Sequence, residues 1–325
     1  RSAETHAAGK MHILLVRHGE SSNNQIEAEL GECHSYYQRR AVDPGLSALG
    51  EEQASALALH LGAQLRSATG QGRVKLICSP MLRAMQTVEP LAAALGVPPL
   101  VRPDCVERCA FFTCDAEGVQ IAMPGPTSDE VRARFPTFDV SLLSDSTEPT
   151  LETAAGARAR AGRVAEELLV TAKSAMSPEL LVIVSHAEFI GALARALLSP
   201  SPTAEVLAVE ESAFAQTGEA YWDLNNCATV QLSLQGCGKV RLLHWNRSDH
   251  LIESLRSGIA WKNMPGCEGA AGWARHGEGG SGLPPLFTES QTVAAPSPPG
   301  WRYAAAGAAG AAVALLAQKW RRGYF

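Results

Sequence analysis

An arginine and a histidine directly follow a short apolar run near the start of the chain. Residues 13–16 read Ile-Leu-Leu-Val, which has the length and character of a buried strand, and Arg17 and His18 come next. Gly19 then permits the abrupt backbone turn that ends such a strand. A neutral imidazole is a nucleophile near neutral pH, and a guanidinium beside it can hold a phosphoryl group through two parallel hydrogen bonds. The alternative is a solvated surface turn after a core strand.

Three more side chains suited to phosphate chemistry lie at comparable places. Arg83 falls in the first turn of a predicted helix, 81–95, where a cation is unfavourable unless an anion is bound there. His186 follows the apolar run 180–184, and Glu107 lies in a loop after another short strand. Parallel strands end at one edge of a sheet, so these side chains can converge. Two arginines and two histidines would neutralise a phosphoryl dianion, and a carboxylate at the rim would supply the proton for the leaving oxygen.

Strands and helices alternate along the chain in the pattern of a doubly wound sheet. Strands are predicted at 13–16, 74–78, 100–101, 180–184, 227–234 and 239–244, and helices after the cap residue Ser47 and at 81–95, 128–135, 152–173 and 189–198. Residues 23–40 are predicted as a loop or irregular helix beside the site. The fold class expected is therefore α/β, a three-layer αβα arrangement around a mainly parallel sheet.

The composition also suggests how the chain is divided. Residues 1–10 are polar and predicted to be disordered, and 11–256 are predicted to form one domain, with the breaker-rich segment 113–150 inserted over the site. Gly, Pro and Ser dominate 257–302, which predicts a flexible linker. The apolar run 303–320 is only marginally long enough for a hydrocarbon core of roughly 30 Å. It is either a tail anchor that associates with an intracellular membrane or an Ala-rich segment that stays in water.

The overall composition argues against some classes of partner. The chain has 325 residues, 46% of them hydrophobic, a net charge of −5 and no basic stripe, so no nucleic-acid partner is expected. Its eight cysteines have neither the spacing of a disulfide framework nor that of a zinc site. They predict free thiols and a location that is cytoplasmic or faces a reducing compartment.

Several short motifs occur in a fixed order. They are Arg17-His18-Gly19-Glu20-Ser21 with Asn24, Leu46-Ser47 with Gly50, Gln53 and Ala54, Ser79-Pro80 with Arg83, Gln86 and Thr87, then Glu107, Ser185-His186 and Asn226. This ordered set resembles the histidine phosphatase (phosphoglycerate mutase-like) superfamily over roughly residues 11–251. The resemblance implies a phosphoglycerate mutase-like fold and a reaction that needs no metal or other cofactor. It implies His18 as the phosphorylated nucleophile, Glu107 as general acid and then base, and Arg17, Asn24, Arg83 and His186 as phosphate ligands.

Three departures from the family's patterns bear on its branches. Phosphoglycerate mutases carry Glu-Arg-His-Tyr-Gly from the acid onward, whereas Glu107 and Arg108 are followed here by Cys-Ala-Phe. Ser21 stands where acid phosphatases and phytases have arginine. His186 is followed by Ala-Glu where many relatives have glycine, and Glu188 adds a negative charge that would weaken phosphate binding.

The leading functional hypothesis is a metal-independent phosphomonoesterase that works through a phosphohistidine. Its substrate would be a phosphorylated small molecule or a phosphoprotein. The alternatives are a mutase-type phosphoryl transfer and a non-catalytic, membrane-tethered interaction protein. Arg132 and Arg134 on the helix of the predicted insertion are candidates for binding a second acidic group, although a solvated face is the default for exposed charge.

Overall fold

The computed structural model describes residues 10–30, 34–69, 73–116, 118–145, 148–174, 179–198 and 224–258, which build a six-stranded sheet with helices around it. The strand order is β3-β2-β6-β1-β7-β8. The strands are β1 Lys10–Arg17, β2 Val74–Cys78, β3 Leu100–Val101, β6 Glu179–Ser185, β7 Thr229–Gln235 and β8 Val240–Arg247. The first four strands in this order run parallel. β7 pairs antiparallel with β1, and β8 pairs antiparallel with β7. The predicted mainly parallel sheet is therefore confirmed.

The register of the central strands brings their carboxyl ends to one line. Arg17 at the end of β1 pairs with Ser185 at the end of β6, and Cys78 at the end of β2 pairs with Val184. The chain segments that leave these three strands therefore start side by side. This is the edge at which the sequence placed its phosphate-binding residues.

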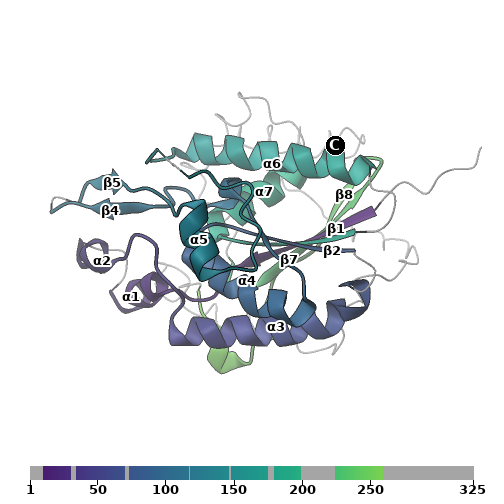
Figure 1. Ribbon diagram of the computed structural model, residues 1–325, viewed down its shortest axis with the longest axis horizontal. Helices are drawn as coiled ribbons and strands as arrows, with labels where there is room; N and C mark the ends of the chain where they lie inside the picture. Colours follow the sequence, from purple (N-terminus) through teal and green to yellow (C-terminus); the bar gives the residue numbers. More distant parts are fainter. Residues whose placement is uncertain are drawn as a thin grey trace, which may run out of the picture. The chain divides into compact units, whose positions relative to one another are not determined.

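Two pairs of helices cover the two faces of the sheet (Figure 1). Helices α3 (Ala48–Thr69) and α4 (Leu82–Leu95) pack against each other on one face, and α6 (Ala154–Ser174) and α7 (Ala187–Leu198) pack on the other. The central strand β1 is buried along nearly its whole length because apolar side chains face helices on both sides. This is the predicted three-layer arrangement.

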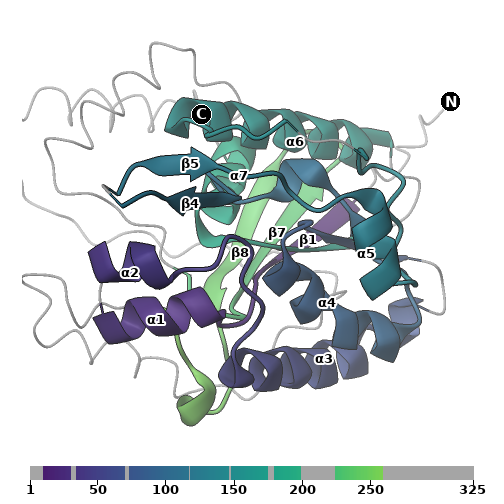
Figure 2. The ribbon, with the colours of Figure 1, turned by 60° about the vertical axis from the view of Figure 1, so that its left-hand side comes forward.

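Smaller elements surround this core. Figure 2 shows α1 (Ser22–Leu30), α2 (His34–Arg39) and the hairpin of β4 (Phe112–Cys114) and β5 (Gln120–Ala122) on one side of the ribbon, and α5 (Ser128–Arg134) apart from them, near α4. The described part of residues 23–40 thus forms two short helices, where the sequence predicted a loop or an irregular helix. The hairpin was not predicted, because strands of three residues give too short a hydrophobic pattern to detect.

The C-terminal part of the chain divides off as a separate unit, 287–325, from a first unit of residues 1–286. The described residues all belong to the first unit, so the predicted anchor 303–320 and nearly all of the predicted linker lie outside them. Within the ranges described, no helix is both long and apolar enough to cross a membrane.

Candidate active site

The hydrogen bonds of His18 define which ring nitrogen can act as a nucleophile. Nδ1 lies 2.7 Å from the backbone oxygen of Gly19, and because a carbonyl only accepts, Nδ1 carries the hydrogen. Arg83 Nε donates to the other nitrogen, Nε2, at 3.1 Å, so Nε2 presents its lone pair. Burial, reinforced by Arg83 and Arg17, holds the pKa of His18 well below its usual value. The imidazole is thus neutral, and its lone pair points at a guanidinium.

The second histidine is a buried ring next to the first. His186 is fully buried, and its ring centre is 5.1 Å from that of His18. Its Nε2 is 2.8 Å from Ser79 Oγ, which also accepts the backbone N–H of Met81. Among the described residues the buried Nδ1 of His186 has no partner. Burial and Arg83 lower the pKa of His186 well below its usual value, which keeps the ring neutral.

The two predicted phosphate-binding arginines come from different elements, Arg17 from the end of β1 and Arg83 from α4. Arg83 belongs to the first turn of α4, and burial lowers its pKa to about 10, against the opposing charge of Asp43. It therefore stays charged at neutral pH. Arg17 is 9% exposed, and it donates to the backbone oxygens of Leu224 and Gly258 at 2.5 and 3.4 Å.

The side chain of Asn24 is held in place through its oxygen. Its Oδ1 accepts from the backbone N–H and the hydroxyl of Ser21, at 3.2 and 3.0 Å, and from Asn226 Nδ2 at 3.5 Å. Every side-chain bond of Asn24 within the described ranges therefore uses the oxygen. The amide hydrogens remain for an anion, which suits the predicted role as a phosphate ligand.

Two glycines allow the turn after His18 to touch the start of α3. A Cβ on Gly50 would lie 2.0 Å from the backbone oxygen of Glu20, and one on Gly19 would lie 2.7 Å from that of Gly50. Buried polar side chains then fix the turn. Gly19 N–H donates to Thr87 Oγ1 at 2.9 Å and Glu20 N–H to Gln53 Oε1 at 2.8 Å. The motif residues around the histidine thus set the backbone that holds its ring.

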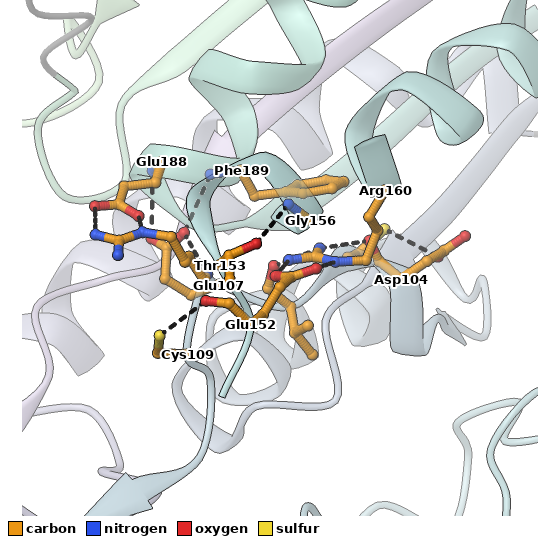
Figure 3. Close-up of polar contacts among 12 residues, drawn as sticks. Asp104, Glu107, Cys109, Glu152, Thr153, Gly156, Arg160, Glu188 and Phe189 are labelled. Atoms are coloured by element: carbon orange, nitrogen blue, oxygen red, sulfur yellow. Dashed lines mark hydrogen bonds and ion pairs between the residues drawn. The ribbon is translucent and has the colours of Figure 1, made fainter. Parts of the chain in front are cut away.

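Glu107 sits at the amino end of α7, close to Arg83. Its carboxylate accepts the backbone N–H groups of Phe189 at 3.1 Å and Glu188 at 3.3 Å (Figure 3). Burial and the Glu188 charge raise its pKa above the usual carboxyl value, while Arg83 opposes the shift. A carboxyl group with a raised pKa near a cationic pocket is suited to donate a proton and take one back.

Arg108 neutralises the unusual charge of Glu188. Its Nε and one terminal nitrogen bind the two carboxylate oxygens at 2.7 and 3.0 Å, which is a two-point ion pair. Figure 3 shows Glu188 lying next to Glu107. The Glu188 carboxylate is bound to the residue after the acid, so the expected weakening of phosphate binding is offset by an adjacent cation.

Arg160 of α6 holds the loop that carries the acid. One terminal nitrogen donates to the backbone oxygens of Asp104 and Val106, both at 2.9 Å, while Nε and the other terminal nitrogen bind Glu152 at 2.9 and 2.5 Å. Its guanidinium also lies 5.2 Å from the ring centre of Phe189, whose N–H the acid accepts. Arg160 is only 8% exposed, and Figure 3 shows its side chain between Glu152 and Asp104.

Two other acidic residues, Asp104 and Glu117, lie close to Glu107 in the sequence. Asp104 is bound by Arg102 at 2.9 and 2.5 Å, away from the cationic pocket, and Glu117 lies outside the described residues. Arg132 pairs with Asp129 at 2.5 Å on exposed α5, as the solvated-face interpretation expects. The structure therefore brings Glu107 to the predicted cluster.

The sequence did not assign roles to several residues that hold this cluster. They are Gln53, Ser79, Thr87, Arg160, Asn226, Ser257 and Gly258. Some of them lie in the short motifs, which was the only signal available. Arg160 gave none, because an arginine on an amphipathic helix is ordinarily exposed.

Potential metal ligands do not cluster in the described ranges, where no group of three or more His, Cys, Asp or Glu side chains could hold an ion. The six cysteines described there are free thiols.

The chain belongs to the histidine phosphatase superfamily (branch 1), whose family model matches residues 13–210. The predicted membership is confirmed, and the chain is by family a phosphatase. Among similar solved structures, mycobacterial glucosyl-3-phosphoglycerate phosphatase is 20% identical, with a TM-score of 0.43 over 74% of this chain and 100% of that one. Ecdysone phosphate phosphatase from Bombix mori is 14% identical, with a TM-score of 0.49 over 78% and 98%. No curated protein matches the chain in sequence at a significant level.

Proposed function

We propose that the chain is a metal-independent phosphomonoesterase in which His18 is phosphorylated and the phosphohistidine is then hydrolysed. The observation that carries the proposal is the tautomer of His18. Its Nδ1–H is held by a backbone carbonyl, and its Nε2 lone pair meets the Arg83 guanidinium at 3.1 Å. An anion that binds Arg83 is thereby brought in front of a neutral nucleophile.

In the first step, Nε2 attacks phosphorus, and the bond from phosphorus to the ester oxygen breaks. Arg17, Arg83, Asn24 and His186 bind the non-bridging phosphate oxygens, and protonated Glu107 gives its proton to the leaving oxygen. In the second step, ionised Glu107 takes a proton from water, whose oxygen attacks phosphorus and breaks the P–N bond. Phosphate leaves, and His18 and Glu107 return to their starting states.

The proposal includes the organisation of the chain. Residues 11–256 would form the catalytic domain, with 113–150 as an insertion at the rim of the site. Residues 1–10 would be a disordered start and 257–302 a linker, and 303–320 would be the apolar segment that decides between an anchored and an unanchored protein.

An aryl phosphate assay in EDTA tests the proposal. The wild type should release phosphate at the same rate with and without chelator, and His18→Ala should release none. Brief incubation with 32P-labelled substrate should label the wild type with an acid-labile phosphate, and the variant should stay unlabelled. Loss of activity in EDTA, or equal labelling of both proteins, would overturn the mechanism. Interconversion of phosphoglycerates faster than phosphate release would instead favour the mutase alternative.

A further inference from the structure

Arg40 lies on a segment that is attached next to two of the phosphate-binding residues. Ala41 exchanges two hydrogen bonds of 2.9 Å with the side chain of Asn23, the residue before Asn24. Two residues further on, Asp43 accepts the backbone N–H of Leu82, which precedes Arg83, at 3.0 Å. Arg40 therefore enters the site region from a backbone that is fixed on both sides of the pocket.

The guanidinium of Arg40 is placed by the β4–β5 hairpin. It lies 3.6 Å from the ring centre of Phe112, and one of its terminal nitrogens donates to the backbone oxygen of the same residue. Stacking on an aromatic ring fixes the plane of a guanidinium and leaves its edge to bind planar oxyanions. The hairpin thus holds this arginine in one orientation, near Arg83.

The charge of Arg40 has no carboxylate partner in the part of the chain that the structure describes. Its Nε is buried and has no hydrogen-bond partner there. It is also near enough to Arg83 that the two like charges contribute to lowering the pKa of Arg83. Unpaired donors and close like charges are unfavourable, and a bound anion would relieve both.

We propose that Arg40 binds a second oxyanion of the substrate, so that the substrate class is a phosphate monoester that also carries a carboxylate or another phosphate. The proposal rests on the phosphatase function above, because it assumes that the ester phosphate sits at His18. Arg83 would bind the transferred phosphate, and Arg40 would bind the second group and fix the orientation of the leaving group.

A matched series of substrates tests this assignment. Alkyl monophosphates of two, three and four carbons are compared with esters of the same lengths that end in a carboxylate or in a second phosphate. For the wild type, kcat/KM should be highest for one of the doubly charged esters. In Arg40→Gln, the ratio of that kcat/KM to the value for the plain alkyl ester should fall about ten- to a hundredfold, the range for a hydrogen bond to a charged group.

Arg39 provides the control, because it is adjacent in sequence, exposed, and paired with Glu29 at 3.9 Å. Arg39→Gln should leave the ratio within twofold, and Arg40→Lys should give an intermediate loss because it keeps the charge without the planar fork. A ratio that Arg40→Gln leaves unchanged at every chain length would overturn the proposal. If the ratio is unchanged while His18→Ala is inactive, the phosphatase function stands; if His18→Ala keeps its activity, the phosphatase function itself fails.

Discussion

Replacing Arg160 with lysine should slow the first step, the transfer of phosphate to His18, only for substrates whose leaving group needs a proton. Arg160 makes four hydrogen bonds with three different nitrogens, two to the carbonyls of Asp104 and Val106 and two to Glu152. A lysine has one nitrogen with three hydrogens, so it cannot serve both carbonyls and both carboxylate oxygens together. The charge would remain, but the loop that carries Glu107 would lose at least one of its supports.

The magnitude follows from what a general acid contributes. Proton donation supplies about 10²- to 10⁴-fold, and a displacement of about 1 Å can cost on the order of 10²-fold. We therefore expect Arg160→Lys to lower kcat/KM for an alkyl phosphate about 30- to 100-fold. Nitrophenolate leaves without protonation, and kcat/KM does not include the later hydrolysis of the phosphohistidine, so kcat/KM for p-nitrophenyl phosphate should fall less than about threefold on the same grounds. The free energy of unfolding should fall by about 1–3 kcal/mol, because buried carbonyls lose a donor.

The assay compares kcat/KM for both substrates in the wild type, Arg160→Lys and a control, Arg163→Lys, which changes an exposed arginine of the same helix. The control should match the wild type with both substrates. An equal loss of kcat/KM for the alkyl and nitrophenyl esters in Arg160→Lys would refute the reasoning, because it would mean general damage to the site rather than a misplaced acid.

The proposed acid and the turn after His18 give two further predictions. Glu188→Gln removes a like charge beside the acid and lowers its pKa, so the alkaline fall in kcat/KM should begin about half a pH unit lower. Arg108→Gln removes the cation that is bound to Glu188, so it should raise the pKa of Glu107 and move the alkaline fall in kcat/KM to higher pH. Shifts of the same sign in the two pH profiles would contradict the assignment of Glu107 as the acid. Gly50→Ala should lower the unfolding temperature steeply or prevent folding, because its Cβ would be 2.0 Å from the Glu20 oxygen. Gly162→Ala, in a helix with open space around it, should raise that temperature slightly, and equal effects of the two changes would be inconsistent with the packing.

The converging cluster could be predicted because its members follow apolar strands. The runs before Arg17 and His186 predict buried parallel strands, and the topology of such sheets brings the residues after them to one edge. The charge of Arg83 at a helix start pointed to an anion. Each of these signals is local in sequence. The rule that parallel strands end at one edge of the sheet then predicts that the residues converge.

What holds the cluster could not be predicted in the same way. Arg17 is supported by Leu224, which is 207 positions away, and Glu107 depends on the backbone of α7. Neither contact leaves a pattern in the nearby sequence. The hairpin that places Arg40 has strands of three residues, which are too short for an alternating pattern to stand out. Long-range contacts between a side chain and the backbone therefore cannot be predicted from local sequence patterns.

The last residues described by the structure contact the proposed phosphate-binding residue Arg17 and its neighbour Asn226, which predicts where the chain can be shortened. Ser257 accepts the backbone N–H of Asn226 at 2.9 Å, and the oxygen of Gly258 accepts from Arg17 at 3.4 Å. Gly258 has a φ of 116°, and a Cβ there would lie 2.5 Å from Asn226 Oδ1 and 2.9 Å from the Arg17 nitrogen. A protein that ends at Arg256 loses these contacts, although the sequence placed the end of the catalytic domain there.

We expect a chain that ends a few residues after Gly258 to keep the kcat/KM of the full chain toward an aryl phosphate. A chain that ends at Arg256 should lose on the order of tenfold, mostly through KM, because Arg17 binds phosphate less well when its backbone partner is gone. Gly258→Ala in the full chain should show the same direction of change, which separates the contact from any effect of shortening. Equal kcat/KM for all of these proteins would show that the contacts of Ser257 and Gly258 do not position Arg17. The domain would then end at residue 256, as the composition alone suggested.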